Sequence, residues 1–541
     1  MILAETNQLA FADLAVIAAY LLGTIGLGLY IGRKMKTGTD FFLAGRQLPW
    51  WAIGMSLVAT DIGGTDIIGV GGAAYKHGLA VANFEWIGCV PAMIVASFIF
   101  IPFLYRTGVF TIPEYLERRY NATVRSIVAS CWLIFMACNL GIMLLASSKM
   151  MSPLLNIEVA YCIWATAGLV GFYTCVGGLA AVVYTDVIQC AVMIAGCLMV
   201  LVLGLSRVGG WDGLQERLAA AEAQQVEQQS PDSGIDGQSA DANTTELSHP
   251  IEHTQLILPA DTKTPFPWPA IYFGLALILS PAYWIGNQAI VQRSLGARSE
   301  FEAKASYVWG ALLKNVIPLI IAIPGLIALA MFPGMKDGDQ AFPRLVNELL
   351  PIGLRGLFVA AFLAALMSSI DSYLNSASTI VSNDLYKRFM NPAATDEKLL
   401  SIGRFTTGGL VAWAVMFAFL LTRMNEDSGI YAIFQTLMAF FQGPVLAVLL
   451  TGMLWRRATG AAAIVALICG IATSMSLYAL NQESVYTYLG IAPLFQISEP
   501  FLYFSVWAFL VSLSLVIVCS LFTLPEKEEK SDLVVSWRSK S

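Results

Sequence analysis

Charged residues are scarce in this chain of 541 amino acids. Asp, Glu, Lys and Arg together make up 13% of it, whereas an average soluble domain has roughly 25%. Hydrophobic residues make up 57% of the chain, and long apolar segments recur along it. The composition excludes an ordinary soluble domain and predicts an all-α polytopic membrane protein embedded in a lipid bilayer.

Reactive motifs are also missing. None of the nine cysteines belongs to a Cys-x-x-Cys pair, so we expect neither a disulfide framework nor a zinc site. The chain has no His-Glu-x-x-His and no Gly-x-Ser-x-Gly sequence, which argues against an enzyme. Nothing in the charge distribution indicates nucleic-acid binding, and no feature points to an obligate protein partner.

The first 32 residues lack Lys and Arg, so the opening apolar segment has no basic n-region of a signal peptide and is expected to remain as a spanning helix. Thirteen spans are expected in all, at residues 12–32, 49–75, 79–105, 123–151, 157–175, 181–205, 268–290, 306–332, 354–386, 401–422, 428–454, 460–480 and 501–523.

The distribution of basic residues predicts the orientation of these spans. With the N-terminus outside, 21 of the 31 Lys and Arg residues lie on the cytoplasmic side, nine lie outside, and Lys314 lies within the membrane. This arrangement satisfies the positive-inside rule, and the opposite one violates it. We therefore expect a multi-pass protein of the plasma or inner membrane with a cytoplasmic C-terminus.

The spans and loops suggest six parts. These are an N-terminal helix and link (1–48), a first five-helix repeat (49–207), an acidic loop (208–266), a second five-helix repeat (267–454), two additional helices (455–524) and a cytoplasmic tail (525–541). The loop contains ten acidic and two basic residues and few aromatic ones, so we expect it to be mostly disordered, although its start could prolong a helix.

Residues 49–77 combine features that a simple spanning helix avoids. Asp61 and Asp66 lie in this apolar stretch, which Gly63-Gly64 interrupts. A carboxylate at mid-bilayer costs about 2.5–3.5 kcal/mol, and Gly costs about 1 kcal/mol against Ala inside a helix. Irregular backbone at membrane depth is tolerated where it lines a wet cavity, and its carbonyls can then hold a cation. We expect a discontinuous helix at an ion and solute site.

A second interrupted span follows five spans later, where Pro281 and Gly286 break residues 268–290. Two interrupted helices at corresponding positions of two five-helix halves indicate an inverted-repeat transporter with its site near the membrane midplane.

Three segments carry polar residues in a distinctive order. They are GGLAAVVYTDVIQ, YWIGNQAIVQR followed by Lys314, and SSIDSYLNSASTIVSNDLYKR. In this order they resemble the motifs of the sodium:solute symporter family, and the first segment is similar to that family's GGxxAVxxTDxxQ signature. The resemblance implies a LeuT-type five-plus-five fold, with discontinuous first and sixth core helices, and a sodium/glucose cotransporter-like protein.

The resemblance also implies a sodium site. Its ligands are expected to be the carbonyls of Ala59, Ile62 and Ala365 and the hydroxyls of Ser368 and Ser369. A hard cation prefers such oxygen ligands, although serines in membrane helices also bond carbonyls of their own helix. Asp186 and Ser372 form a second sodium site in one interpretation, and in the other Asp186 is satisfied by local donors.

A solute pocket is expected from six further residues. These are Asp61, Asp66, Glu85, Tyr283, Lys314 and Gln435. Glu85, Lys314 and Gln435 match positions that bind hydroxyls in the sugar branch of the family, and Tyr283 matches its inner-gate aromatic. A purely structural Glu85–Lys314 pair is the alternative. Asp66 departs from the sugar pattern and leaves room for an amino sugar, a polyol or another hydroxylated solute.

We expect a sodium-coupled importer of a small polar solute, a sugar or sugar-like polyol, that works by alternating access with the sodium ion as its cofactor. The alternatives are an amino-acid or carboxylate symporter coupled to sodium or protons, and a solute sensor that does not transport.

Overall fold

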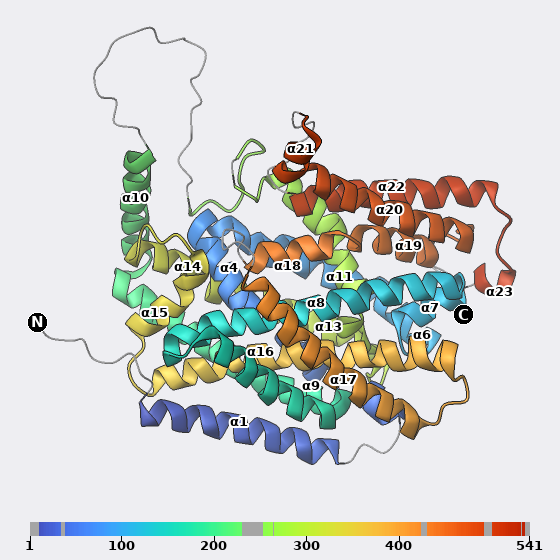
Figure 1. Cartoon of the computed structure of the whole chain (residues 1–541), viewed down its shortest axis with the longest axis horizontal. Helices are drawn as coiled ribbons and strands as arrows, with labels where there is room; N and C mark the ends of the chain where they lie inside the picture. Colours follow the sequence, from blue (N-terminus) through green and yellow to red (C-terminus); the bar gives the residue numbers. More distant parts are fainter. Residues whose placement is uncertain are drawn as a thin grey trace, which may run out of the picture.

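The computed structural model describes residues 10–33, 38–229, 253–262, 264–423, 430–491, 500–531 and 533–535. In these ranges the regular structure is helical, and extended pairing is confined to two isolated bridges, Leu48 to Ala297 and Leu258 to Pro267. Most long helices lie along one common axis (Figure 1).

The first half of the chain contains fourteen helical elements. They are α1 (Phe11–Gly32), α2 (Gly38–Leu43), η1 (Ala44–Arg46), α3 (Trp50–Asp61), α4 (Gly64–His77), η2 (Leu79–Ala82), η3 (Phe84–Cys89), α5 (Val90–Val95), η4 (Ala96–Phe100), α6 (Ile101–Thr107), α7 (Ile112–Arg119), α8 (Ala122–Leu155), α9 (Val159–Val208) and α10 (Gly210–Gln229).

The second half contains the remaining elements. They are η5 (Ala270–Leu279), α11 (Ser280–Gly286), α12 (Gln288–Leu295), α13 (Glu300–Lys314), α14 (Ile317–Met331), η6 (Gly338–Gln340), α15 (Ala341–Leu349), α16 (Leu354–Thr379), η7 (Ile380–Met390), α17 (Asp396–Leu421), α18 (Ile430–Ala439), α19 (Gln442–Leu454), α20 (Gly460–Leu480), α21 (Glu483–Leu489), α22 (Pro500–Phe522) and α23 (Glu528–Ser531).

The described residues form up to twelve membrane spans. Nine helices are long and apolar enough to cross a bilayer, and three bent helix pairs add one span each. Two of these pairs, α3/α4 bent by 57° and η5–α11/α12 bent by 50°, are the interrupted spans that the sequence predicts. The one remaining expected span, at 157–175, corresponds to the shorter apolar helix Val159–Gly171 at the start of α9.

The segment α9 is continuous where the sequence predicts two spans, at 157–175 and 181–205. A straight helix of 50 residues would extend about 75 Å, more than twice the hydrocarbon thickness of a bilayer. However, Thr166 near its start lies 3.1 Å from Ser147 of α8, and Gly204 near its end packs on Leu349 of α15. Lys149, near Ser147 in α8, pairs with Asp339 of η6, directly before α15. Both ends of α9 therefore lie near α15, and α9 doubles back as two antiparallel spans would.

The span expected at 428–454 is a third interrupted helix, which was not predicted from the sequence. Helices α18 and α19 meet at 42° just before Gln442. Pro444 lies in the first turn of α19, where it removes no helical hydrogen bond. A Cβ on Gly443 would lie 2.6 Å from the carbonyl oxygen of Ser505, so this glycine allows α22 to pack closely at the bend.

The loop 208–266 is folded at both described ends. The sequence allowed a helix at its start, whereas the expectation of disorder is wrong for the described residues near its other end. Residues 210–229 form α10, and His253 is buried against the main body. The backbone N–H of His253 donates to Glu222 Oε1 at 3.0 Å, and the N–H of Leu79 donates to the carbonyl of His253 at 2.7 Å. Residues 230–252 of this loop lie outside the described residues.

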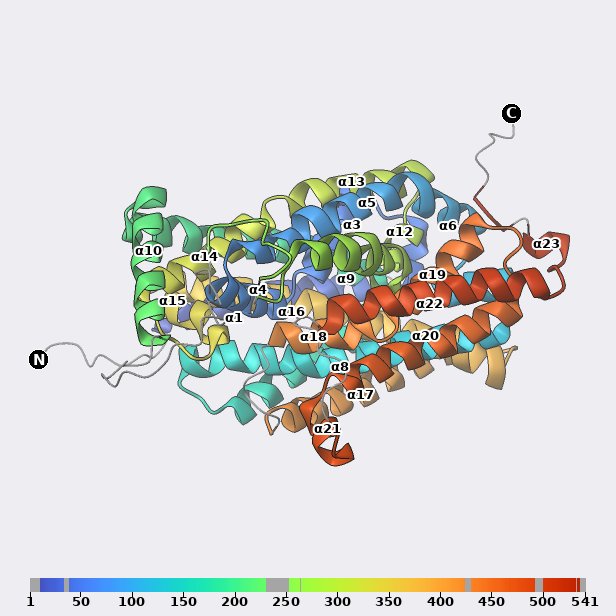
Figure 2. The same cartoon turned by 90° about the horizontal axis from the view of Figure 1, so that it is seen from above.

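Helix α16 runs through the middle of the bundle, and nearly all of its side chains are buried (Figure 1). It packs against α9, α1, α8 and α3. Helices α20 and α22 pack against each other along one edge (Figure 2). At one end of the long axis lie α10 and α15, and at the other lie α6, α7 and α23 (Figure 1); we call these the α10 end and the α7 end.

Candidate ion and solute site

The break between α3 and α4 lies against α16 near the middle of the bundle. Helix α3 ends at Asp61, and Ile62 (φ −93°, ψ 88°) and Gly63 (φ −93°, ψ −176°) leave the helical range before α4 begins. A Cβ on Gly63 would lie 2.7 Å from the hydroxyl of Ser369, so glycine permits the close approach of the break to α16. The backbone carbonyls at the end of α3 are thereby held beside two serines.

Backbone and hydroxyl oxygens form a compact cluster at this point. The hydroxyl of Ser368 donates to the carbonyls of Ala59 at 2.6 Å and Ala365 at 2.9 Å. The hydroxyl of Ser369 donates to the carbonyl of Thr60 at 2.9 Å and to that of Ala365 at 3.2 Å. Four of the five predicted sodium ligands therefore lie together, and the carbonyl of Thr60 joins them.

This oxygen cluster suits a small hard cation. All of its groups are uncharged oxygens, which are the ligands that such cations prefer, and the two hydroxyls can rotate their hydrogens away from an ion. Ile62, the fifth predicted ligand, lies at the break itself, where the backbone is not helical.

The guanidinium of Arg293 joins the residues predicted to hold a second sodium. It donates to Ser56 at 2.7 Å, to Thr60 Oγ1 at 2.5 Å and to Ser372, and it lies 3.5 Å from Asp186 Oδ2. Asp186 also accepts a bond from Ser56 at 2.6 Å. Sequence reasoning missed Arg293, although this residue ends the segment YWIGNQAIVQR and is buried in α12.

A pocket lies next to the break. It contains five of the six residues predicted to bind solute, and its lining is Asp61, Asp66, Phe84, Glu85, Cys89, Leu275, Leu279, Ser280, Tyr283, Trp284, Phe434, Gln435, Met438 and Gln442. All three interrupted helices, together with η3, contribute to this lining.

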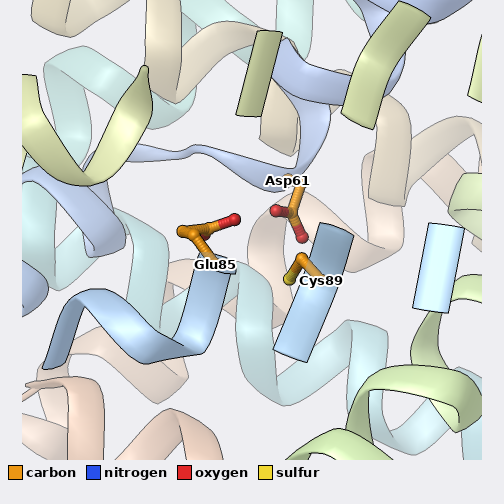
Figure 3. A group of neighbouring side chains, drawn as sticks. All are labelled: Asp61, Glu85 and Cys89. Atoms are coloured by element: carbon orange, nitrogen blue, oxygen red, sulfur yellow. The ribbon is translucent and has the colours of Figure 1, made fainter. Parts of the chain in front are cut away.

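Lys314, the sixth predicted residue, is buried and donates to both Asp61 and Glu85. Figure 3 shows the carboxylates of Asp61 and Glu85 and the thiol of Cys89, whose ligand atoms all lie within 4.8 Å of one another. The Lys314 ammonium also lies 5.5 Å from the centre of the Trp284 ring. The Lys314 ammonium therefore offsets part of the negative charge in this group.

Asp66 performs a structural task at the start of α4. Its Oδ2 accepts a hydrogen bond from the N–H of Gly63 at 2.9 Å, and Thr65 Oγ1 lies 3.4 Å from the same oxygen. Because the first N–H groups of a helix have no partner within it, this bond stabilises the start of α4. Asp66 also lines the cavity, so it faces both the backbone break and the solute space.

Polar groups from the other two interrupted helices complete the cavity. Tyr283 and Tyr373 share a hydrogen bond of 3.2 Å between their hydroxyls, and Gln435 is almost fully buried. Gln442 is fully buried, and neither its side-chain oxygen nor its nitrogen has a partner within the described residues. Sequence reasoning missed Gln442; the signal was the Gly443-Pro444 pair, which marks the break that places it in the cavity.

The chain is similar in sequence to known proteins. The sequence pattern of the sodium:solute symporter family matches residues 41–470. A sodium/glucose cotransporter of Vibrio parahaemolyticus is 32% identical over 496 residues, which cover 86% of this chain and 84% of the relative. A sodium/myo-inositol cotransporter 2 of Bos taurus is also 32% identical, and the match covers 97% of this chain and 78% of the relative.

A solved structure of a Na⁺-coupled sialic acid symporter, in a substrate-bound outward-open state, has the same fold. It superposes with a TM-score of 0.76 at 21% identity and covers 96% of this chain and 99% of that one. The architecture is therefore of the LeuT type, with the discontinuous helices α3/α4 and η5–α11/α12 at its centre. The match over residues 41–470, together with these relatives, shows that the chain belongs to the sodium:solute symporter family and is a sodium-coupled membrane transporter, not an enzyme.

Proposed function

We propose that this protein imports a sugar or a sugar-like polyol together with sodium. The observation that supports this proposal is the polar lining of the cavity, where Asp61 and Glu85 offer carboxylates and Gln435 and Gln442 offer amide groups. Lys314 bonds both carboxylates from outside this lining. Such a mixture of donors and acceptors suits a solute with several hydroxyl groups. The relatives whose names mention glucose and myo-inositol point to the same solute class.

Coupling follows from the position of the two sites on one broken helix. Ala59 and Thr60 contribute carbonyls to the oxygen cluster, and Asp61, the next residue, lines the solute cavity. A bound sodium ion supplies a positive charge that holds the break of α3/α4 against α16. The same residues that hold this break in the conformation that binds sodium also hold Asp61 in position for the solute. Solute affinity and sodium affinity must then rise together, because coupling between two binding sites is reciprocal.

One sodium ion per cycle is the stoichiometry that we propose. The Arg293 guanidinium already bonds Ser372 and lies 3.5 Å from Asp186, so a second sodium ion there would have to displace it or share its partners. A sodium-activation curve with a Hill coefficient near one is expected. A coefficient near two that falls to one in Asp186→Asn would instead establish the second site.

We also propose that the α10 end faces the outside of the plasma or inner membrane and that the C-terminus is cytoplasmic. Sodium entering along a membrane potential then gains about 2.3 kcal/mol per 100 mV, which drives import.

A carboxylate or amino-acid solute is the rival, and the geometry disfavours it. Recognition of a carboxylate needs a cation, and Lys314 already bonds two acidic side chains.

Uptake into proteoliposomes tests the proposal. With an inward sodium gradient, labelled glucose or myo-inositol should accumulate, accumulation should fail when potassium replaces sodium, and Ser369→Ala should raise the sodium concentration that gives half-maximal uptake. Sodium-driven accumulation of only amino acids or carboxylates would refute the assigned solute class.

A further inference from the structure

The solute cavity contains more negative than positive charge. Three carboxylates line it, from Asp61, Asp66 and Glu85, and Lys314 is the cation that bonds to this group within the described residues. With all three acids ionised, one ammonium would leave an excess of two negative charges. A sodium ion in the neighbouring oxygen cluster reduces this excess to one. Buried charge of one sign is expensive unless a partner offsets it.

Asp66 is the carboxylate without a charged partner. The Lys314 ammonium donates to Asp61 and Glu85, whereas the two groups that bond Asp66 are the uncharged Gly63 N–H and Thr65 hydroxyl. Within the described residues no Lys, Arg or His forms an ion pair with Asp66. The positive end of the α4 dipole acts on Asp66, but it carries only about half an elementary charge and does not replace a cation.

The remaining lining suits a cation that also carries hydroxyl groups. Aromatic rings of Phe84, Trp284 and Phe434 line the same cavity, and ring faces attract ammonium groups. Independently of the acidic residues, Gln442 is fully buried with both amide atoms unpartnered in the described part of the chain. A buried polar side chain of this kind needs a ligand or a water molecule.

We propose that the solute carries a positively charged amine beside its hydroxyl groups, as an amino sugar or an amino polyol does, and that the Asp66 carboxylate binds the amine. This inference rests on the proposed function, sodium-coupled uptake of a polyhydroxylated solute, and narrows its solute class. Gln435 and Gln442 then bind the hydroxyl groups, and the ammonium of the solute offsets negative charge of the lining.

Matched pairs of solutes test this proposal. Binding to the purified protein is measured by calorimetry, in sodium and in potassium, for 1-amino-1-deoxysorbitol against sorbitol and for glucosamine against glucose and N-acetylglucosamine. In sodium the charged amine should bind about tenfold more tightly than its neutral partner, since a charge-assisted hydrogen bond is about twice as strong as a neutral one. N-acetylglucosamine keeps the nitrogen without its charge and should behave like glucose.

The variant Asp66→Asn keeps an oxygen that can accept the Gly63 N–H bond and removes the charge. It should abolish the preference for amines while its melting temperature stays close to that of the unsubstituted protein. Asp337→Asn is the matched control, because Asp337 lies outside the cavity lining, 3.8 Å from Lys149, and the amine preference should persist in it.

The remaining outcomes separate the two proposals. If neutral sugars or polyols bind in sodium as tightly as their amines, the amine inference is overturned and the proposed function stands. If no member of the panel binds in sodium, the proposed function itself fails. An amine preference that survives in Asp66→Asn would overturn the role given to Asp66.

Discussion

At the scale of single residues, the candidate site depends on buried charged and amide side chains, which have few hydrogen-bond or ion-pair partners among the surrounding helices. Lys314 is buried at the end of α13 and is bonded to acids from the α3/α4 break and from η3. The predicted pair between Lys314 and Glu85 therefore forms, and Asp61 is a second acidic partner of Lys314. The cavity geometry makes the structural and solute-binding interpretations of this pair compatible, since Asp61 and Glu85 both line the space.

Replacing Lys314 should damage stability as well as binding. Lys314→Met leaves two carboxylates without their cation, and breaking a buried pair in this way costs about 3–5 kcal/mol. The melting temperature of the purified protein should fall clearly, and the double variant Lys314→Met/Glu85→Gln should recover part of the loss. A melting temperature unchanged by Lys314→Met would contradict the ion-pair geometry.

Gln442 should matter for solute and little for folding. Gln442→Leu removes two polar atoms that no described residue satisfies, so the melting temperature should stay equal or rise. The affinity for solute should fall about fivefold to tenfold, which corresponds to one lost hydrogen bond of roughly 1–1.4 kcal/mol. Gln47→Leu, on the exposed turn after η1, is the control and should leave solute affinity unchanged. Equal affinity in both variants would exclude Gln442 from the site.

At the scale of elements, breaks in helices create the site. The three bent spans α3/α4, η5–α11/α12 and α18/α19 all contribute residues to one cavity, while the nearly fully buried α16 provides the serines opposite the first break. Short side chains decide how close these elements lie. A Cβ on Gly325 of α14 would lie 2.3 Å from the carbonyl oxygen of Gly71 in α4, so α4 and α14 pack backbone to backbone.

Gly63→Ala should weaken sodium binding. The added Cβ would lie 2.7 Å from the Ser369 hydroxyl and would push the break away from α16. We expect the half-maximal sodium concentration for uptake to rise about tenfold, equivalent to about 1.4 kcal/mol. The control is Gly23→Ala in α1, where the same Cβ meets no atom within 4 Å, and sodium dependence should be unaltered. The idea fails if both variants show the same sodium dependence.

At the scale of the whole molecule, polar contacts join separate helices on the α7 side of the cavity. Gln292 of α12 donates to the carbonyl of Phe42 at 2.7 Å and to Thr379 at 3.0 Å. Closer to the α7 end, Arg125 of α8 pairs with Asp384 at 2.6 Å and with Glu117 at 2.5 Å. These contacts connect α12 to α2 and α16, and α8 to η7 and α7.

The loss of thermal stability at acid pH should depend on the ion pairs of Glu117 in this network. Burial alone would raise the pKa of the Glu117 carboxyl, but hydrogen bonds from Arg388 and Arg125 outweigh it and lower that pKa below its ordinary value. A lowered folded-state pKa adds stability that is present above the ordinary glutamate pKa and is lost as the pH falls through the folded-state value.

Melting temperatures measured between pH 7 and pH 3 should therefore fall less steeply on the acid side in Glu117→Gln than in the unsubstituted protein. Glu397→Gln serves as the control, because this exposed residue at the start of α17 forms no ion pair with these arginines within the described residues. Identical pH profiles in all three proteins would show that the Glu117 pairs add nothing to stability.

The sequence by itself determined the class of fold and most of the candidate site. Apolar segments of spanning length, the glycines and acids of residues 49–77, and the ordered motifs from GGLAAVVYTDVIQ to SSIDSYLNSAS predict a LeuT-type sodium symporter. They also name residues that the structure brings together, because a polar side chain in an apolar helix has few places to be except a shared interior site.

Tertiary structure alone decided which of these groups satisfy one another. It placed Arg293 between Asp186 and Ser372, gave Lys314 a second acid in Asp61, and turned Gln442 into the cavity at a third bend. It also folded both described ends of the acidic loop against the body. These outcomes depend on distances between residues far apart in the chain. Hydropathy and composition describe the residues within each segment and do not say which other segments those residues contact.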